Sequence, residues 1–150
     1  MVSPGSESSR QRLALLTYVK LMRAANTART VAASQLAGSG LTLTQFAVLE
    51  ALYHLGPMSL SEIAQKVLTT GGNLTMVVGN LEKSGLAKRQ RSPQDQRVLV
   101  VHLTSEGKAL IRRVFPQHAK VLTEFLARLT PPEQRQLGEL ARKLGKPGVS

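Results

Sequence analysis

Cationic side chains gather around a short turn in the middle of this chain of 150 residues: Lys88, Arg89, Arg91 and Arg97. The segment 92–96, Ser-Pro-Gln-Asp-Gln, has the composition of a tight turn. Its single carboxylate, Asp95, lies two residues before Arg97 and can hold that guanidinium pointing away from the body of the protein. A fixed arginine suits phosphates or a narrow groove of negative potential, whereas the alternative is a surface ion pair of about 0–1 kcal/mol.

The segment just before this turn, 73–84, predicts a helix with one polar face. Its apolar residues recur at the spacing of one buried helical face: Leu74, Val77, Val78 and Leu81. Asparagine and threonine on the other face can donate to base edges or phosphates, and Met76 can lie against a thymine methyl group. The alternative, an ordinary amphipathic helix with a solvated face, is disfavoured by the basic turn beside it. With one residue from the preceding turn, the predicted DNA contacts are Thr70, Asn73, Thr75, Met76, Asn80, Lys83, Lys88, Arg91, Asp95 and Arg97.

Local features of the sequence place this polar face and the basic turn side by side. Ser59 and Glu62 form a capping box that begins a short helix, and the Thr-Thr-Gly-Gly segment 69–72 ends it. The helix over 73–84 follows, and apolar alternation over 98–103 predicts the returning strand of a β-hairpin. This order is typical of a helix-turn-helix with a basic wing, in which the second helix enters the major groove.

The remaining segments flank this unit on both sides and are rich in apolar residues. The segment 11–35 contains no Gly or Pro and carries two overlapping apolar stripes, so it should pack against its own domain and against a partner chain. Capping boxes at Thr42 and Thr130 predict two further helix starts. A long helix over 104–129 contains Pro116, which should kink it or split it in two.

Composition excludes several classes of function. The formal net charge of +11 and a pI near 11.0 indicate a polyanionic partner, of which nucleic acid leads the candidates. The absence of cysteine excludes disulfides, thiolate catalysis and thiolate metal sites. The three histidines lack ligand spacing and no catalytic group stands out, so we predict no enzyme activity, no metal and no cofactor. No apolar run is long enough to span a membrane, and residues 1–9 lack the pattern of a signal peptide, which predicts a cytoplasmic protein.

Several of these segments together resemble the MarR family of winged helix-turn-helix regulators. The similarity extends over residues 13–144 and rests on segments in a fixed order: Leu43–Leu49, Leu60–Ala64, Asn73–Thr75, Leu81–Leu86, Asp95–Arg97 and Leu103–Gly107. The Asp-Gln-Arg sequence at 95–97 matches the D-x-R motif of that family's wing. The resemblance implies a homodimer joined by its N- and C-terminal helices, with two lobes that bind successive major grooves of a palindrome. It also implies repression that a small molecule relieves.

In similar proteins, a ligand site lies where the dimerisation helices meet the winged lobe. The corresponding candidates in this chain are Tyr18, Met22, Leu41, Tyr53, His54 and Met58. Their alternative role is packing of the core and hinge, and an aromatic content of 3% favours an aliphatic pocket over an aromatic one. Two features depart from the family's pattern. Gly79 stands in mid-helix where similar sequences often carry a polar residue, and the lack of cysteine excludes the oxidant sensing of some relatives.

The sequence therefore predicts a mainly α fold with a small β-hairpin wing, a winged helix-turn-helix flanked by N- and C-terminal dimerisation helices. The expected parts are a disordered tail (1–9), an N-terminal dimerisation helix (10–40), the DNA-binding domain (41–104) and C-terminal dimerisation helices (105–146). The predicted function is a homodimeric, sequence-specific transcriptional regulator that represses from a palindromic operator in double-stranded DNA. The alternative is a basic nucleic-acid-binding protein without sequence specificity, and a helical interaction adaptor is disfavoured by the basic wing.

Overall fold

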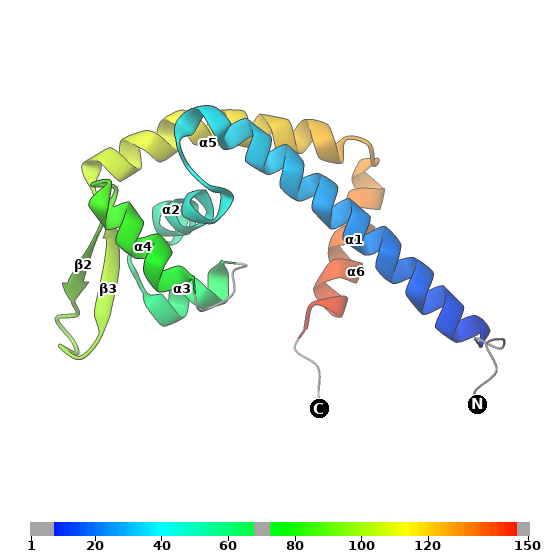
Figure 1. Ribbon diagram of the computed structural model, residues 1–150, viewed down its shortest axis with the longest axis horizontal. Coiled ribbons are helices and arrows are strands. Elements are labelled where there is room, and N and C mark those ends of the chain that lie inside the picture. Colours follow the sequence, from blue (N-terminus) through cyan, green and yellow to red (C-terminus); the bar gives the residue numbers. More distant parts are fainter. Residues whose placement is uncertain (1–7, 68–72, 147–150) are drawn as a thin grey trace.

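Our computed structural model describes residues 8–67 and 73–146. The elements are α1 (Ser9–Leu36), η1 (Ala37–Ser39), α2 (Leu43–Leu55), β1 (Met58–Ser59), α3 (Leu60–Lys66), α4 (Leu74–Lys83), β2 (Ala87–Arg91), β3 (Leu99–Leu103), α5 (Ser105–Leu126) and α6 (Pro131–Leu144). Figure 1 shows a winged lobe made of α2, α3, α4 and the strands under one end of α5, while α1 and α6 extend away from it. The predicted mainly α fold with a small sheet is confirmed. No helix within the described ranges is long and apolar enough to cross a membrane.

The strands form one antiparallel sheet in the order β1-β3-β2. β2 and β3 make the predicted hairpin, in which Arg91 lies opposite Leu99 next to the tip. The third strand, β1, was not predicted, and it pairs Met58 with Val101. A strand of two residues is too short to show the alternation by which strands are identified. The wing is therefore the outer part of a three-stranded sheet rather than an isolated hairpin.

The hydrophobic core of the lobe joins its helices to the sheet. Side chains with no more than 1% exposure come from six elements: Leu36, Phe46, Val48, Leu49, Ile63, Val78, Leu81, Val101 and Ile111. Each such side chain contributes about 1.5–3 kcal/mol when it is removed from water. Leu36 ends α1 and Ile111 lies in the first half of α5, so each of these long helices is fixed to the lobe at one end and leaves it at the other (Figure 1).

Capping boxes begin α2, α3 and α6 at the predicted positions. At α2, the Thr42 hydroxyl accepts from the Gln45 backbone N–H at 3.1 Å, and the Gln45 side chain accepts from the Thr42 N–H at 2.9 Å. Helix α1 begins slightly earlier than predicted, because the Ser8 hydroxyl accepts from the Gln11 N–H at 3.2 Å. Gly85, with a φ of 74°, turns the chain from α4 into β2, a conformation in which a side chain would be strained.

Pro116 does not split α5, so that one of the two predicted outcomes is wrong. The helix is continuous from Ser105 to Leu126, and Figure 1 shows a single, gently arched helix. Curvature of this kind accommodates a proline ring that would otherwise meet the carbonyl group four residues earlier. The helix also ends before residue 129, where the sequence placed its end, because the Leu129 N–H bonds back to the Leu126 carbonyl in a turn at 2.9 Å.

Candidate nucleic-acid interface

Helix α4 presents its polar face to solvent. The side chains buried against the lobe lie on one side of it: Leu74, Val78 and Leu81. The other side carries the predicted contact residues of this helix, all exposed: Asn73, Thr75, Met76, Asn80 and Lys83. Met76 is 65% exposed, so packing within the lobe does not account for an apolar side chain at this position. Asn73 precedes the helix, and its exposed side chain makes no capping hydrogen bond to it.

Helix α3 lies beside α4 and completes the helix-turn-helix. It begins at the capping box in which the Glu62 carboxylate accepts from the Ser59 N–H at 3.0 Å, and it buries Ile63 in the core. The segment between the two helices, 68–72, lies outside the described residues, and so does the predicted contact Thr70. Helix α4 is the second helix of this unit, the position of a recognition helix.

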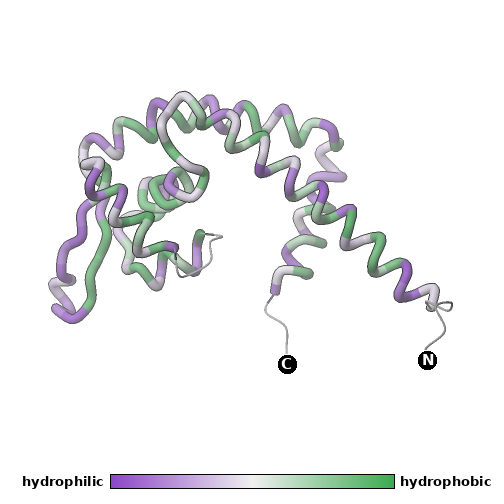
Figure 2. The backbone as a smooth tube through the Cα atoms, viewed as in Figure 1, coloured by the Kyte–Doolittle hydropathy of each residue, from purple (hydrophilic) through white to green (hydrophobic). Residues whose placement is uncertain are grey.

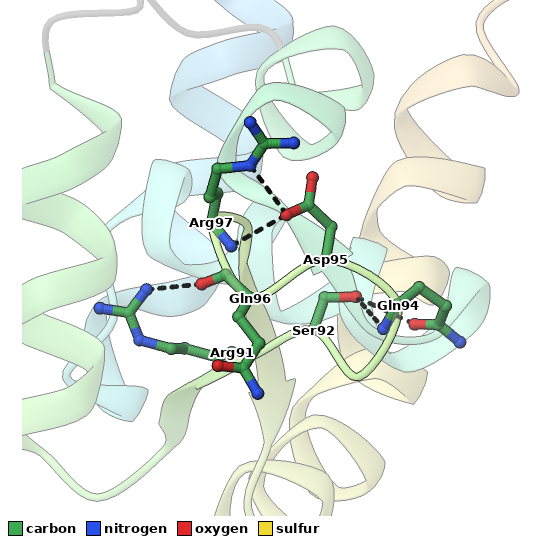
Figure 3. Close-up of polar contacts among 6 residues, drawn as sticks. All are labelled: Arg91, Ser92, Gln94, Asp95, Gln96 and Arg97. Atoms are coloured by element: carbon green, nitrogen blue, oxygen red, sulfur yellow. Dashed lines mark hydrogen bonds and ion pairs between the residues drawn. The ribbon is translucent and has the colours of Figure 1, made fainter.

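The tip of the wing holds Arg97 at two points. One carboxylate oxygen of Asp95 accepts from the Arg97 backbone N–H at 3.0 Å and from its guanidinium Nε at 3.2 Å (Figure 3). Arg91 donates from Nη1 to the backbone carbonyl oxygen of Gln96 at 2.6 Å, so it is tied to the same loop. The Arg97 side chain nevertheless remains 92% exposed. The predicted orientation of this arginine by Asp95 is therefore confirmed.

An ion pair joins the wing to the recognition helix. Arg89 Nε on β2 lies 2.6 Å from Glu82 Oε1 on α4, and both side chains are largely covered. Arg89 is thus engaged within the lobe, unlike the exposed Arg91 and Arg97. The sequence did not identify this pair. The only signal was a pair of opposite charges on either side of the turn at Gly85, seven residues apart.

Lys88 occupies a different part of the hairpin from the arginines at the tip. It lies opposite His102 on β3, whereas Arg91 lies opposite Leu99. Strands rise about 3.3 Å per residue, so Lys88 is roughly 10 Å from Arg91 along β2. Of the predicted wing contacts in β2, Arg91 is therefore the one beside the tip.

Of the three histidines, His118 is the one buried in the lobe. His118 is buried, with its Nδ1 3.2 Å from Gln35 Oε1 of α1 and its ring centroid 4.4 Å from that of Phe46 of α2. Burial lowers the pKa of His118, and the nearby Glu50 carboxylate partly opposes that shift. Within residues 8–67 and 73–146, no three His, Cys, Asp or Glu side chains lie close enough to hold a metal ion.

Four of the predicted ligand residues do not line a common site. Tyr18 and Met22 lie in the first half of α1 and are exposed to solvent in the single chain. Leu41 and Met58 belong to the hydrophobic core, and Met58 pairs with β3. Leu41 and Met58 match the alternative role of core packing, whereas the exposed Tyr18 and Met22 match neither role in the single chain.

The other two, Tyr53 and His54, line two different cavities although they are adjacent in sequence. Consecutive helical residues point about 100° apart. His54 faces a cavity of about 600 Å³ bounded by α1, α2 and the end of α3, together with Arg29, Glu50 and Lys66. Tyr53 faces a second cavity of about 340 Å³ beside β3 and α5. The sequence did not single out Arg29 or Lys66, because no local pattern distinguishes them from other surface cations.

Comparison with known proteins agrees with this geometry. A model of the MarR family matches residues 41–99. The HTH-type transcriptional regulator YkoM of Bacillus subtilis (strain 168) is 39% identical over 106 residues, which cover 71% of this chain and 69% of YkoM. BpsR of Bordetella bronchiseptica, whose DNA binding is regulated by 6-hydroxynicotinic acid, is 25% identical with a TM-score of 0.81, covering 96% of this chain and 100% of that one. Sco3205 of Streptomyces coelicolor, a MarR family regulator solved in complex with DNA, is 27% identical with a TM-score of 0.81. The match covers 97% of this chain and 94% of Sco3205. This chain therefore belongs to the MarR family of winged helix-turn-helix, DNA-binding transcriptional regulators.

Proposed function

We propose that this chain is a homodimeric, sequence-specific repressor that binds a palindromic operator. In each half-site the recognition helix lies in the major groove and the wing reaches phosphates or the minor groove. The residues that face bases and phosphates are then Asn73, Thr75, Met76, Asn80, Lys83, Arg91 and Arg97. The observation that carries the proposal is Arg97, which is 92% exposed yet held by Asp95 through both its backbone and its side chain. Two recognition helices would lie about 10–11 bp apart, one turn of DNA.

Unpartnered apolar side chains on α1 and α6 support the dimer. Helix α6 has no buried residue, and its leucines are exposed at helical spacing: Leu137, Leu140 and Leu144. Isolated helices of this length are marginally stable in water, so α6 needs a surface to pack on. The first half of α1 exposes a further series: Leu13, Leu15, Leu16, Tyr18, Val19, Leu21 and Met22. Figure 2 shows hydrophobic residues along both helices, far from the lobe, where a second copy of the chain would cover them.

The cavity of about 600 Å³ is the proposed site of a small-molecule effector. It lies between α1, which leaves the lobe, and α2, which belongs to the lobe's core. Aliphatic side chains such as Leu43 and Ala47 form much of its wall, and the two cations Arg29 and Lys66 outnumber the one carboxylate, Glu50. Such a lining suits an organic acid, and BpsR is regulated by one. An effector here would alter the spacing of the two lobes, so that both recognition helices could no longer dock at once.

The net charge of +11 favours a second candidate, a basic protein that binds nucleic acid without sequence preference. Footprinting on the DNA that flanks its own gene, followed by competition with random DNA, separates the two. A specific regulator should protect a palindrome and prefer it by at least about 10³-fold. Equal competition by random DNA would support the second candidate instead.

A further inference from the structure

The second cavity lies where α2, β3 and the first turns of α5 meet. Its volume of about 340 Å³ is near the lower end of the range for ligand-binding cavities in proteins. Four polar side chains line it: Tyr53, His102, Lys108 and Arg112. It shares no lining residue with the cavity of about 600 Å³, so it is a separate site.

The polar lining of this cavity is basic. Lys108 and Arg112 are four residues apart on α5 and therefore lie on the same side of that helix, where like charges repel each other. No carboxylate lines the cavity, and the ion pairs in the described part of the chain involve neither residue. Lys88, directly opposite His102 in the hairpin, adds a positive charge on the same face of the sheet. An anion between these side chains would relieve their repulsion.

Arg112 is already held in place. Its Nε donates to the Tyr53 hydroxyl at 3.3 Å, and its Cζ lies 6.0 Å from the centroid of the Tyr53 ring. These contacts use one of the five N–H donors of the guanidinium and leave the terminal nitrogens for a ligand. Two terminal N–H groups of arginine match the paired oxygens of a phosphate or a carboxylate.

We infer that this cavity binds a small anion, through a phosphate or carboxylate group, between Lys108 and Arg112. β3 runs from Leu99 next to the wing tip to Leu103, which lines the cavity, so the site lies at the end of the hairpin away from the tip. It is therefore separate from the proposed DNA contacts at Arg91 and Arg97. Because α2 belongs to the lobe and α5 continues out of it, a bound anion links the two helices and stabilises their relative position.

Titration of the full-length protein with inorganic phosphate, at constant pH and ionic strength, tests this site. His102 is one of three histidines, so its imidazole proton resonances can be assigned by NMR with the His102→Gln variant. We expect a saturable shift of the His102 resonances, with little change at His54 and His118. Lys108→Gln should weaken phosphate binding at least about tenfold, because it removes a charged hydrogen-bond donor. A parallel titration with succinate identifies whether the site prefers a phosphate or a carboxylate.

The matched control is Arg113→Gln, which removes one positive charge from an exposed position beside Arg112 but does not alter the cavity lining. Lys108→Gln breaks no hydrogen bond in the described part of the chain, so it should fold, whereas Arg112→Gln also loses the contact with Tyr53. Equal weakening by Lys108→Gln and Arg113→Gln would indicate only general attraction by net charge and would overturn the inference. Absence of a saturable His102 shift with either anion would do the same. So would a loss of operator affinity confined to Lys108→Gln, because DNA would then be the occupant.

Discussion

Arg89 on β2 and Glu82 on α4 are joined by an Nε–Oε1 contact of 2.6 Å, and their side chains are only 29% and 30% exposed. The pair connects the base of the wing to the recognition helix across the turn at Gly85. The relative position of the two parts of the lobe that are proposed to contact DNA should therefore depend on it. A partly buried, charge-assisted hydrogen bond of this kind is stronger than an exposed surface pair.

Glu82→Gln should weaken operator binding even though it removes a negative charge from a DNA-binding protein. Loss of the charge alone would strengthen binding to any DNA, so a loss of affinity confined to the operator reports on positioning. We expect operator affinity to fall about 3- to 10-fold and the free energy of unfolding to fall by about 1 kcal/mol. Affinity for random DNA should stay the same or rise, as measured by fluorescence anisotropy.

Glu139→Gln is the control for this change. It breaks the Arg142–Glu139 pair of 2.8 Å on α6, whose side chains are 64% and 72% exposed. Exposed pairs three residues apart contribute little, so stability should change by less than about 0.5 kcal/mol. If Glu82→Gln and Glu139→Gln change operator affinity to the same extent, the Arg89–Glu82 pair does not position the wing.

Arg97→Ala and Asp95→Asn should weaken DNA binding in different ways. Arg97→Ala removes a cation that is proposed to contact DNA, so affinity should fall and the slope of log affinity against log salt should become shallower by about 1. Asp95→Asn keeps the cation but weakens the contacts that hold it, at 3.0 and 3.2 Å. Operator affinity should then fall while the salt slope is retained. An unchanged affinity and salt slope in Arg97→Ala would rule out the wing contact.

The features that could be predicted from the sequence depend on neighbours along the chain. The capping box of Thr42 and Gln45 involves residues three apart, and the buried face of α4 follows from the helical repeat. The Asp95–Arg97 contact spans two residues of a turn. Local backbone geometry determines interactions between residues this close in the chain. They can therefore be predicted from one sequence.

The features that could not be predicted depend on tertiary packing. β1 exists only because Met58 meets Val101, which lies far along the chain. Tyr53 and His54 were grouped as one ligand site, but the 100° step of the helix directs them into separate cavities. The basic lining of the smaller cavity likewise combines α2, β3 and α5, whose meeting no local pattern indicates.

Gly79→Ala should stabilise the protein and weaken operator binding. Gly79 lies within α4, where an added Cβ would meet no heavy atom within 4 Å, and alanine is favoured in helices by about 0.5–1 kcal/mol. Thr75 and Lys83 lie four residues to either side, so Gly79 is on the side proposed to face DNA. The urea midpoint should rise and operator affinity should fall. Unchanged affinity would mean that the recognition helix does not approach DNA closely here.

Gly107→Ala should have the opposite effect on the stability of the protein. Gly107 is buried in α5, and an added Cβ would collide with the backbone carbonyl oxygen of Leu86. This substitution should lower the free energy of unfolding by about 1–3 kcal/mol, because backbone must move to make room. Alanine should raise the free energy of unfolding at Gly79 and lower it at Gly107. The first effect comes from helix propensity and the second from packing.

Leu140→Glu should convert the protein to a monomer. Leu140 is 58% exposed on α6, and its burial by a second chain is the proposed reason for an apolar stripe on this helix. A buried, unpaired carboxylate is strongly unfavourable, so dissociation should follow at micromolar concentration in sedimentation velocity. Operator affinity should fall with it, because one lobe contacts one half-site. Arg135→Gln makes the same change in net charge on the opposite, exposed side of α6 and should leave the dimer intact.

Stability should fall as the pH drops below about 6.5, and His118 should account for part of that fall. Burial lowers its pKa from the ordinary histidine value of 6.5, and the Glu50 carboxylate partly opposes that shift. Above that value His118 is neutral in both the folded and the unfolded chain. As the pH falls through it, the unfolded chain takes up the proton first, so the free energy of unfolding decreases until the folded pKa is reached.

His118→Gln tests this assignment, because glutamine does not titrate and can still bond to Gln35. Urea unfolding at pH 7.5, 6.5 and 5.5, at one fixed protein concentration, should show a smaller decrease in the variant than in the parent. His102→Gln, on β3, leaves His118 in place and should retain the parent's decrease. His118 joins α1 and α5 to the core around Phe46. If the free energy of unfolding of His118→Gln decreases with pH as steeply as that of the parent, another group causes the acid sensitivity.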